Sequence, residues 1–280
     1  MLGLKHSLTA IALSVLASWS PGSVVSAEDC AARPERIDVA PSEDQPLPRR
    51  GALGLSLRPH AGGGVEVAEV RSGAAAAKAG LQANDVILSV NGTKVASGAQ
   101  VVEILQPLKG GAAAEFVFQR GDEERRLKIT LDPQPVESLD HSSITYGSVK
   151  LPQGYRLRTI ITEPKSAKGK SPAFLFIQGL ACASIDRPSV PDAPDTRLVH
   201  AMAEAGFVTM RVDKPGLGDS EGPPCGSIDF LTELAGYTAA LKQLQAQPSV
   251  DPQRVYLFGH SMGGVMAPYV AKGTGARGAI

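Results

Sequence analysis

The sequence predicts a chain of two domains, a small β-rich domain followed by an α/β domain whose sheet is mostly parallel. Short alternating segments between glycine turns, such as residues 65–70 after a run of three glycines, indicate the first domain. Three continuous apolar runs, 173–177, 207–212 and 255–258, indicate strands that are buried on both faces. Helix-competent segments separate these runs, which favours a parallel sheet with helices on both faces.

Composition limits the classes of partner. The chain has 280 residues, with 28 Lys and Arg against 28 Asp and Glu, so no charge excess favours nucleic acid or an anionic membrane surface. Apolar residues make up 43% of the chain, which is enough for ordinary globular cores. The sequence contains no metal-ligand cluster and no phosphate-binding loop, so we expect neither a metal nor a cofactor.

Residues 1–27 are typical of a secretory signal peptide. Lys5 gives a basic start, an apolar stretch runs from Leu8 to Trp19, and small residues end the segment at Ala27. The alternative is an uncleaved anchor, although the stretch is short for the ~20 residues of a membrane span. We therefore predict an exported protein, periplasmic or secreted, with no membrane span in the mature chain.

Residue composition and apolar pattern divide the chain further into linkers and domains. Residues 28–50 and 132–142 are polar and proline-rich with few large apolar residues, which is typical of flexible linkers. Residues 51–131 hold the β-rich domain, with short helices predicted at 72–79 and 100–105. Residues 143–280 hold the α/β domain. We expect it to begin with a hairpin of strands 144–151 and 155–162 and to contain helices over 196–205 and 228–247.

Residues 51–131 resemble a bacterial PDZ domain. The resemblance rests on three features in order along the chain: Leu53-Gly54-Leu55, Ser72-Gly73 followed by Ala79-Gly80-Leu81, and Asn84-Asp85-Val86-Ile87 followed by Asn91-Gly92. Successive N–H groups in the first of these can form a nest for a carboxylate, and the strand after them can accept an extended peptide.

The resemblance also implies a second wall of the peptide groove. The helix at 100–105 should form it, with Val101 and Leu105, one turn apart, as candidate pocket residues. The implied partner is a peptide or a protein C-terminus. The alternative is that the protein's own tail or linker fills this groove.

The segment Gly259-His260-Ser261-Met262-Gly263 follows the third buried run and precedes a helix-competent segment at 265–272. Here the chain resembles the α/β-hydrolase family, in which G-x-S-x-G places a serine nucleophile on a sharp strand-to-helix turn. The resemblance implies Ser261 as the nucleophile. Gly259 and Gly263 let strand and helix approach, and the helix N-terminus adds a positive dipole where an oxyanion forms. The alternative is an inert elbow serine in a degenerate homologue.

Two loops add to this resemblance. The loop Ile177-Gln178-Gly179-Leu180 implies an oxyanion hole formed by the N–H of Met262 and that of Leu180 or Gly179. Many relatives have His-Gly where this chain has Gln178-Gly179, so the choice of donor stays open. The segment 213–220 resembles a loop whose role in the family is mostly structural, so Asp213 is not nominated as the catalytic acid.

Neither nearby histidine is a predicted general base. His260 lies inside the tight elbow and should point away from Ser261, and His200 is expected at the surface or end of a helix. Cys182 and Cys225 fall in loops at the carboxyl ends of neighbouring strands, so a disulfide between them is possible in an exported protein. The alternative is that all three cysteines are free thiols.

In this family the catalytic acid and base follow the nucleophile along the chain. None of residues 262–280 is Asp, Glu or His. We therefore expect an α/β domain that is incomplete at its C-terminus, in a fragment or a truncated gene product. The 280-residue chain alone is expected to be essentially inactive and poorly soluble.

Together these features predict an exported serine hydrolase that cleaves ester, thioester or peptide bonds through an acyl-enzyme on Ser261. Its substrate is a small acyl compound or a peptide, and esterase and peptidase both stay open. The PDZ module would bind a peptide or a partner protein. The alternative, from another class, is a PDZ-based binding or adaptor protein whose hydrolase part is a catalytically dead scaffold.

Overall fold

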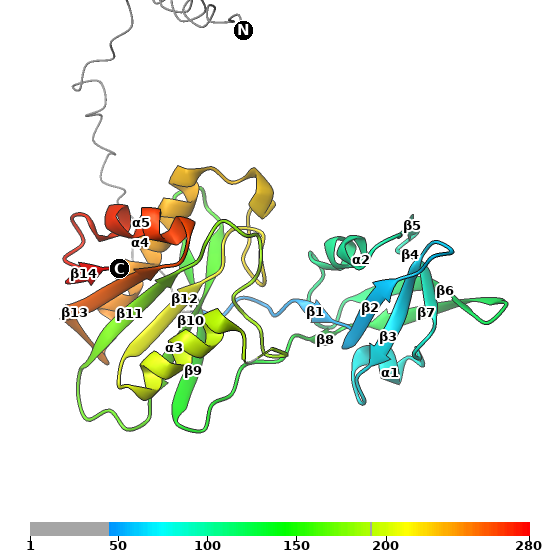
Figure 1. The fold of residues 1–280 in the computed structure, drawn as a ribbon, viewed down its shortest axis with the longest axis horizontal. Coiled ribbons are helices and arrows are strands. Elements are labelled where there is room, and N and C mark those ends of the chain that lie inside the picture. The colour runs from blue at the N-terminus through cyan, green and yellow to red at the C-terminus, as the bar shows by residue number, and fades with distance from the viewer. Residues whose placement is uncertain (1–44, 191) are drawn as a thin grey trace, which may run out of the picture. The chain divides into compact units, whose positions relative to one another are not determined.

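The structure is a computed structural model that describes residues 45–190 and 192–280 (Figure 1). The predicted signal peptide, Cys30 and most of the first predicted linker lie outside the described residues. Among the helices that are described, none is both long and apolar enough to cross a lipid bilayer.

Residues 51–131 form a small antiparallel β domain with two helices. Its main sheet has the strand order β2-β3-β4-β6-β7, with β5 paired to β4, and β1 forms a separate pair with β8. The bounds of these elements are β1 Gly51–Ala52, β2 Leu55–Pro59, β3 Val65–Val70, α1 Ala75–Lys78, β4 Val86–Val90, β5 Thr93–Lys94, α2 Gly98–Leu105, β6 Ala113–Arg120, β7 Glu123–Thr130 and β8 Asp132–Pro133.

The core of this domain comes from alternate positions on its strands. Val65 and Val67 of β3 are fully buried while Glu66 and Ala68, which alternate with them, are only partly buried, as the period-2 pattern of the sequence predicts. Helix α1 is shorter than the predicted segment 72–79. Gly73 has a φ of +74°, so the residues before Ala75 form a turn that cannot continue a helix.

Residues 142–280 form a six-stranded sheet in the order β14-β13-β11-β12-β10-β9. Strands β14, β13, β11 and β12 run parallel, whereas β10 is antiparallel to both β12 and β9. The bounds are β9 Ser142–Lys150, β10 Arg156–Pro164, β11 Ser171–Ile177, α3 Pro194–Glu204, β12 Val208–Val212, a short 3₁₀ helix Cys225–Ser227, α4 Phe230–Ala246, β13 Val250–Gly259, α5 Met262–Ala271 and β14 Gly278–Ala279. The predicted α/β fold class is thereby confirmed, with an antiparallel hairpin at one edge.

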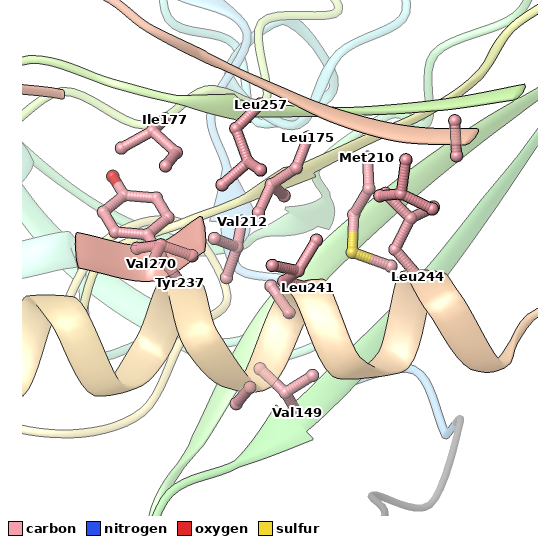
Figure 2. Packing of buried hydrophobic residues seen from close by; sticks show 14 of the residues in the cluster. Val149, Leu175, Ile177, Met210, Val212, Tyr237, Leu241, Leu244, Leu257 and Val270 are labelled. Carbon is pink, nitrogen blue, oxygen red and sulfur yellow. The ribbon is translucent and has the colours of Figure 1, made fainter. Parts of the chain in front are cut away.

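Helices cover both faces of this sheet (Figure 1). On one face, Leu175 and Leu257 of the sheet pack with Tyr237 and Leu241 of α4, which point toward the strands in Figure 2. On the other face, Phe174 and Phe176 pack with Val199 of α3. The successive residues of β11 thus supply opposite faces, which explains why its sequence is a continuous apolar run.

Parts of both predicted linkers are ordered, which differs from the expectation of flexible segments. Leu47 is 4% exposed, and the Arg49 side chain pairs with Asp186 and Asp219 of the α/β domain. Glu137, in the second predicted linker, has a side chain that is only 5% exposed. The polar composition of the two segments predicted exposure to water, but Arg49 and Glu137 pair with buried side chains of opposite charge.

Candidate functional site

Ser261 lies at the junction of β13 and α5 in a conformation that few residues adopt. Its φ is 56° and its ψ is −121°, and it is exposed to solvent. For a residue other than glycine, such backbone angles cost about 1–3 kcal/mol and are concentrated at functional sites. The tight turn also explains why α5 begins at Met262, three residues earlier than the predicted helix.

The two glycines that flank Ser261 are required by the closeness of strand and helix. A Cβ on Gly259 would overlap the carbonyl oxygen of Gly263, and a Cβ on Gly263 would overlap the carbonyl oxygen of Ile177. The His260 N–H donates a 2.9 Å hydrogen bond to that same Ile177 oxygen. The elbow is therefore held against the end of β11.

The loop after β11 lies beside Ser261. A Cβ on Gly179 would stand 3.0 Å from the Cβ of Ser261, so only glycine leaves this space open. Within the described part of the chain, the N–H groups of Met262 and Leu180 have no hydrogen-bond acceptor. Two free donors thus flank the serine, and Met262 is the first residue of α5, where an N–H has no partner within the helix.

Lys214 is a residue near the site that our sequence analysis did not single out. Its side chain is 1% exposed, its Nζ donates to the carbonyl oxygen of Gly179 at 2.7 Å, and it lies 2.9 Å from Glu233 Oε1. Lys214 belongs to the segment Asp213-Lys214-Pro215-Gly216, which the sequence predicts at the carboxyl end of a strand. The sequence did not predict its contacts with Gly179 and Glu233.

The side chain of Asp213 is fully buried and bound by neighbouring groups. It forms an ion pair with Arg158, and it accepts hydrogen bonds from the Ser184 hydroxyl at 3.0 Å and the Ile185 N–H at 2.9 Å. Arg158 also pairs with Asp186, and both side chains are at most 1% exposed. This buried ionic cluster, which the sequence did not reveal, fixes the loops behind the elbow.

The histidines lie in different surroundings. His260 is exposed and neighbours Ser261 in the elbow. His200 was expected at a helix surface or end, but its side chain is only 13% exposed and its Nε2 lies 3.2 Å from Glu137 Oε2. Arg211 also binds Glu137, at 2.6 Å. Burial alone raises the pKa of Glu137, but hydrogen bonds from His200 and Arg211 outweigh it and lower the pKa to about 2.

Cys182 and Cys225 form a disulfide, with Cα atoms 5.7 Å apart. The bond joins the loop after β11 to the 3₁₀ helix that follows the Asp213 loop. It therefore ties together two of the loops at the carboxyl ends of the parallel strands, where ligands bind in open α/β sheets.

The loop that the sequence predicts for carboxylate binding, at Leu53 and Gly54, has bonded carbonyl groups and unbonded N–H groups within the described chain. The carbonyl groups of Leu53 and Gly54 accept hydrogen bonds from Ala76 and Arg71, at 3.0 and 2.8 Å. The N–H groups of Leu53 and Gly54 have no acceptor among the residues that the structure describes. Gly54 has a φ of +73°, which favours glycine. The guanidinium of Arg71 lies beside it, since a Cβ built on Gly54 would stand 3.2 Å from a guanidinium nitrogen.

The two candidate pocket residues of α2 differ in exposure. Val101 is 1% exposed and packs in the domain core, so it offers little surface to a ligand. Leu105 is half-buried, as are Leu55 and Leu57 of β2. Strand β2 pairs only with β3, so its other edge is unpaired within the described chain.

No group of three or more His, Cys, Asp or Glu side chains within residues 45–190 and 192–280 is arranged to hold a metal ion.

Comparison with known proteins identifies the same two modules. A family model described as "PDZ domain" matches residues 51–131, and one described as "Serine aminopeptidase, S33" matches residues 195–279. The chain thus contains a PDZ domain followed by an α/β-hydrolase domain.

Individual relatives match different lengths of the chain. A Pseudomonas fluorescens protein named "Probable periplasmic serine endoprotease DegP-like" is 33% identical over 87 residues, 31% of this chain and 18% of that protein. "Esterase EstD" of Thermotoga maritima is 24% identical over 172 residues, 61% of this chain and 38% of that protein. The solved α/β hydrolase GrgF from Penicillium is 20% identical, with a TM-score of 0.41, over 49% of this chain and 44% of that chain. The chain spans less than two fifths of these two curated relatives.

Proposed function

We propose that this chain, a PDZ domain followed by an α/β-hydrolase domain, belongs to an exported serine hydrolase that cleaves an ester, thioester or peptide bond through an acyl-enzyme on Ser261. The observation that carries the proposal is the backbone of Ser261, with a φ of 56° between β13 and α5. That geometry exposes the hydroxyl above the carboxyl ends of the parallel strands.

The chemistry follows from the groups around the serine. The Ser261 hydroxyl oxygen attacks the substrate carbonyl carbon, and the former carbonyl oxygen becomes an oxyanion. The free N–H groups of Met262 and Leu180 are the donors we assign to it, with Gly179 providing the space beside the Ser261 Cβ. The leaving group departs with a proton, and water then hydrolyses the acyl-enzyme.

A general base is needed to take the proton from Ser261. Among the described residues, none accepts a hydrogen bond from its hydroxyl. The tests below use the full-length protein.

We assign peptide recognition to the PDZ domain. The free N–H groups of Leu53 and Gly54 suit a terminal carboxylate, and the unpaired edge of β2 suits an extended peptide. Arg71, whose guanidinium lies beside Gly54, adds a positive charge at the same place. The ligand class is thus a peptide or protein with a free C-terminus.

Export is supported by two observations. A disulfide joins Cys182 and Cys225, and such bonds persist in oxidising compartments. One relative of the chain carries "periplasmic" in its name. We propose a periplasmic or secreted location, which cell fractionation of the tagged full-length protein tests directly.

The serine hydrolase is tested by a fluorophosphonate probe on the full-length protein. Labelling that peptide mapping assigns to Ser261, together with hydrolysis of activated esters or peptides, supports the proposal. If the folded protein is neither labelled nor active while its PDZ domain still binds peptides, the adaptor function is supported instead. Parallel assays with short-chain esters and aminoacyl substrates separate esterase from peptidase.

A further inference from the structure

We propose that Lys214 is a positioning residue, which holds the Gly179–Leu180 peptide so that the Leu180 N–H serves as an oxyanion donor. This inference rests on the proposed serine hydrolase function and adds a residue outside the elbow to it. The observation behind it is the 2.7 Å hydrogen bond from Lys214 Nζ to the Gly179 carbonyl oxygen.

The geometry of a trans peptide links the two groups. The described chain contains no cis peptide bonds, so the Leu180 N–H points opposite to the Gly179 carbonyl. A hydrogen bond to that carbonyl therefore fixes the direction of the N–H, away from Lys214. Because oxyanion donors act through preorganised direction, a peptide free to rotate would stabilise the transition state less.

Little else holds this peptide. Within the described residues, the bond from Lys214 is the only hydrogen bond made by the backbone groups of Gly179 and Leu180. Leu180 is 68% exposed, so its side chain does not anchor the loop. The disulfide at Cys182 tethers the chain two residues later, but it does not set the rotation of the preceding peptide.

The burial of Lys214 is hard to explain by stability alone. Its side chain is 1% exposed and that of its partner Glu233 is 8% exposed, so both charges are largely removed from water. Apolar residues often replace a buried ion pair with no loss of stability. In addition, Glu233 Oε2 has no hydrogen-bond partner among the residues that the structure describes, so this pair does not satisfy its own polar atoms there.

The Lys214 ammonium makes a hydrogen bond to the Gly179 carbonyl in addition to its ion pair with Glu233. An ammonium has three donors, and one of them reaches the oxyanion loop while another faces Glu233. Glu233 lies on α4, so the network runs from α4 through the loop after β12 to the loop after β11. Helix α4 and the loop after β12, which are distant in sequence, thereby fix the orientation of the Gly179–Leu180 peptide in the loop after β11.

The test uses the full-length protein with Lys214→Met and Glu233→Met combined, so that no buried charge is left alone. We expect kcat per labelled Ser261 to fall about 10- to 100-fold, less than the ~10²–10³-fold lost with an oxyanion donor itself. KM for a short-chain p-nitrophenyl ester should change less than about threefold, since a transition-state interaction is lost. A purely structural role would lower the number of sites that label but leave kcat per site unchanged.

The matched control is Arg254→Met with Asp251→Asn, an exposed ion pair of the same domain, which should leave kcat and KM unchanged. If the first double variant does not fold, Lys214→Met with Glu233→Gln replaces it, with the same expected fall. An unchanged kcat in a folded variant overturns the proposal, and so does unfolding of both double variants, because a positioning residue must be separable from folding. A wild-type protein that neither labels at Ser261 nor turns over substrate overturns the proposed function itself, which distinguishes the two failures.

Discussion

The N–H of His260 and the backbone of Gly263 both lie against the same atom, the carbonyl oxygen of Ile177. The first donates a hydrogen bond of 2.9 Å, and a Cβ on the second would overlap that oxygen. The elbow around Ser261 and the end of β11, from which the proposed oxyanion loop starts, are therefore held in one register by a single backbone carbonyl.

This relationship predicts a strong effect of Gly263→Ala. The added Cβ must displace backbone rather than a flexible side chain, so we expect a loss of about 1–3 kcal/mol in the free energy of unfolding. Labelling of Ser261 should also become slower. The control is Gly264→Ala in the same helix, where the nearest contact would be an ordinary 3.4 Å. That change should be neutral or stabilise by up to about 1 kcal/mol. Chemical denaturation measures both, and equal effects would contradict the steric account.

Glu137→Gln should weaken the α/β domain and change its response to acid. The carboxylate has a pKa of about 2 in the folded protein against an ordinary 4.5, so it contributes stability above about pH 4.5 that is lost as the pH falls toward 2. From this shift we expect the substitution to cost about 3 kcal/mol at neutral pH.

Unfolding curves between pH 7 and pH 2 measure this contribution. Wild type and variant should converge in stability as the pH falls from about 4.5 toward 2, because the carboxylate is protonated in the unfolded chain before it is protonated in the folded protein. Exposed Glu123, paired with Arg125 at the surface, supplies the control substitution Glu123→Gln, which should cost less than about 1 kcal/mol. A constant difference between wild type and the Glu137 variant at all pH values would contradict the assignment.

Loss of the disulfide should destabilise the α/β domain without removing the nucleophile. The bond spans 43 residues, and the loop-entropy model gives about 4 kcal/mol for such a closure. The double substitution Cys182→Ser and Cys225→Ser should therefore lower the melting temperature, and a reductant should lower that of the wild type but not that of the variant. Identical melting of wild type and variant under non-reducing conditions would show that the bond contributes nothing.

The PDZ groove should depend on a free peptide carboxylate. A peptide with an amidated C-terminus should bind at least about tenfold more weakly than its free acid, because charged hydrogen bonds are worth about 1.5–3 kcal/mol. Arg71→Gln should reduce this preference, whereas Arg125→Gln, on the distant β7 hairpin, should not. Isothermal titration of both peptides measures the effect. Equal affinity for the two peptides would exclude carboxylate recognition at Leu53 and Gly54.

Local pattern predicted most of the fold. Strand β3 coincides with the predicted 65–70, and strands β9 and β10 form the predicted hairpin, because the apolar periodicity follows directly from burial. The elbow could be predicted because three features occur in order along the chain: a buried strand, the G-x-S-x-G spacing and a helix-competent segment. What local pattern missed are partners that are distant in sequence.

The missed features share one physical cause. Glu137 was assigned to a linker because its segment is polar and proline-rich, but Arg211 and His200 lie far along the chain and pair with it. Likewise, nothing adjacent to Lys214 signals its contacts with Gly179 and Glu233. The burial of a charged side chain can be predicted only when its partners are known. Those partners are brought together by the fold and are not visible in the local sequence.

The most direct test of the account is fluorophosphonate labelling of the full-length protein, followed by mass spectrometry of the labelled peptide. We predict stoichiometric modification at Ser261 in the folded protein, with none after heat denaturation and none in Ser261→Ala. Esterase or peptidase turnover should disappear together with the label. A folded protein, bound to its peptide ligand yet unlabelled at Ser261, would contradict the assignment of this elbow as a working nucleophile.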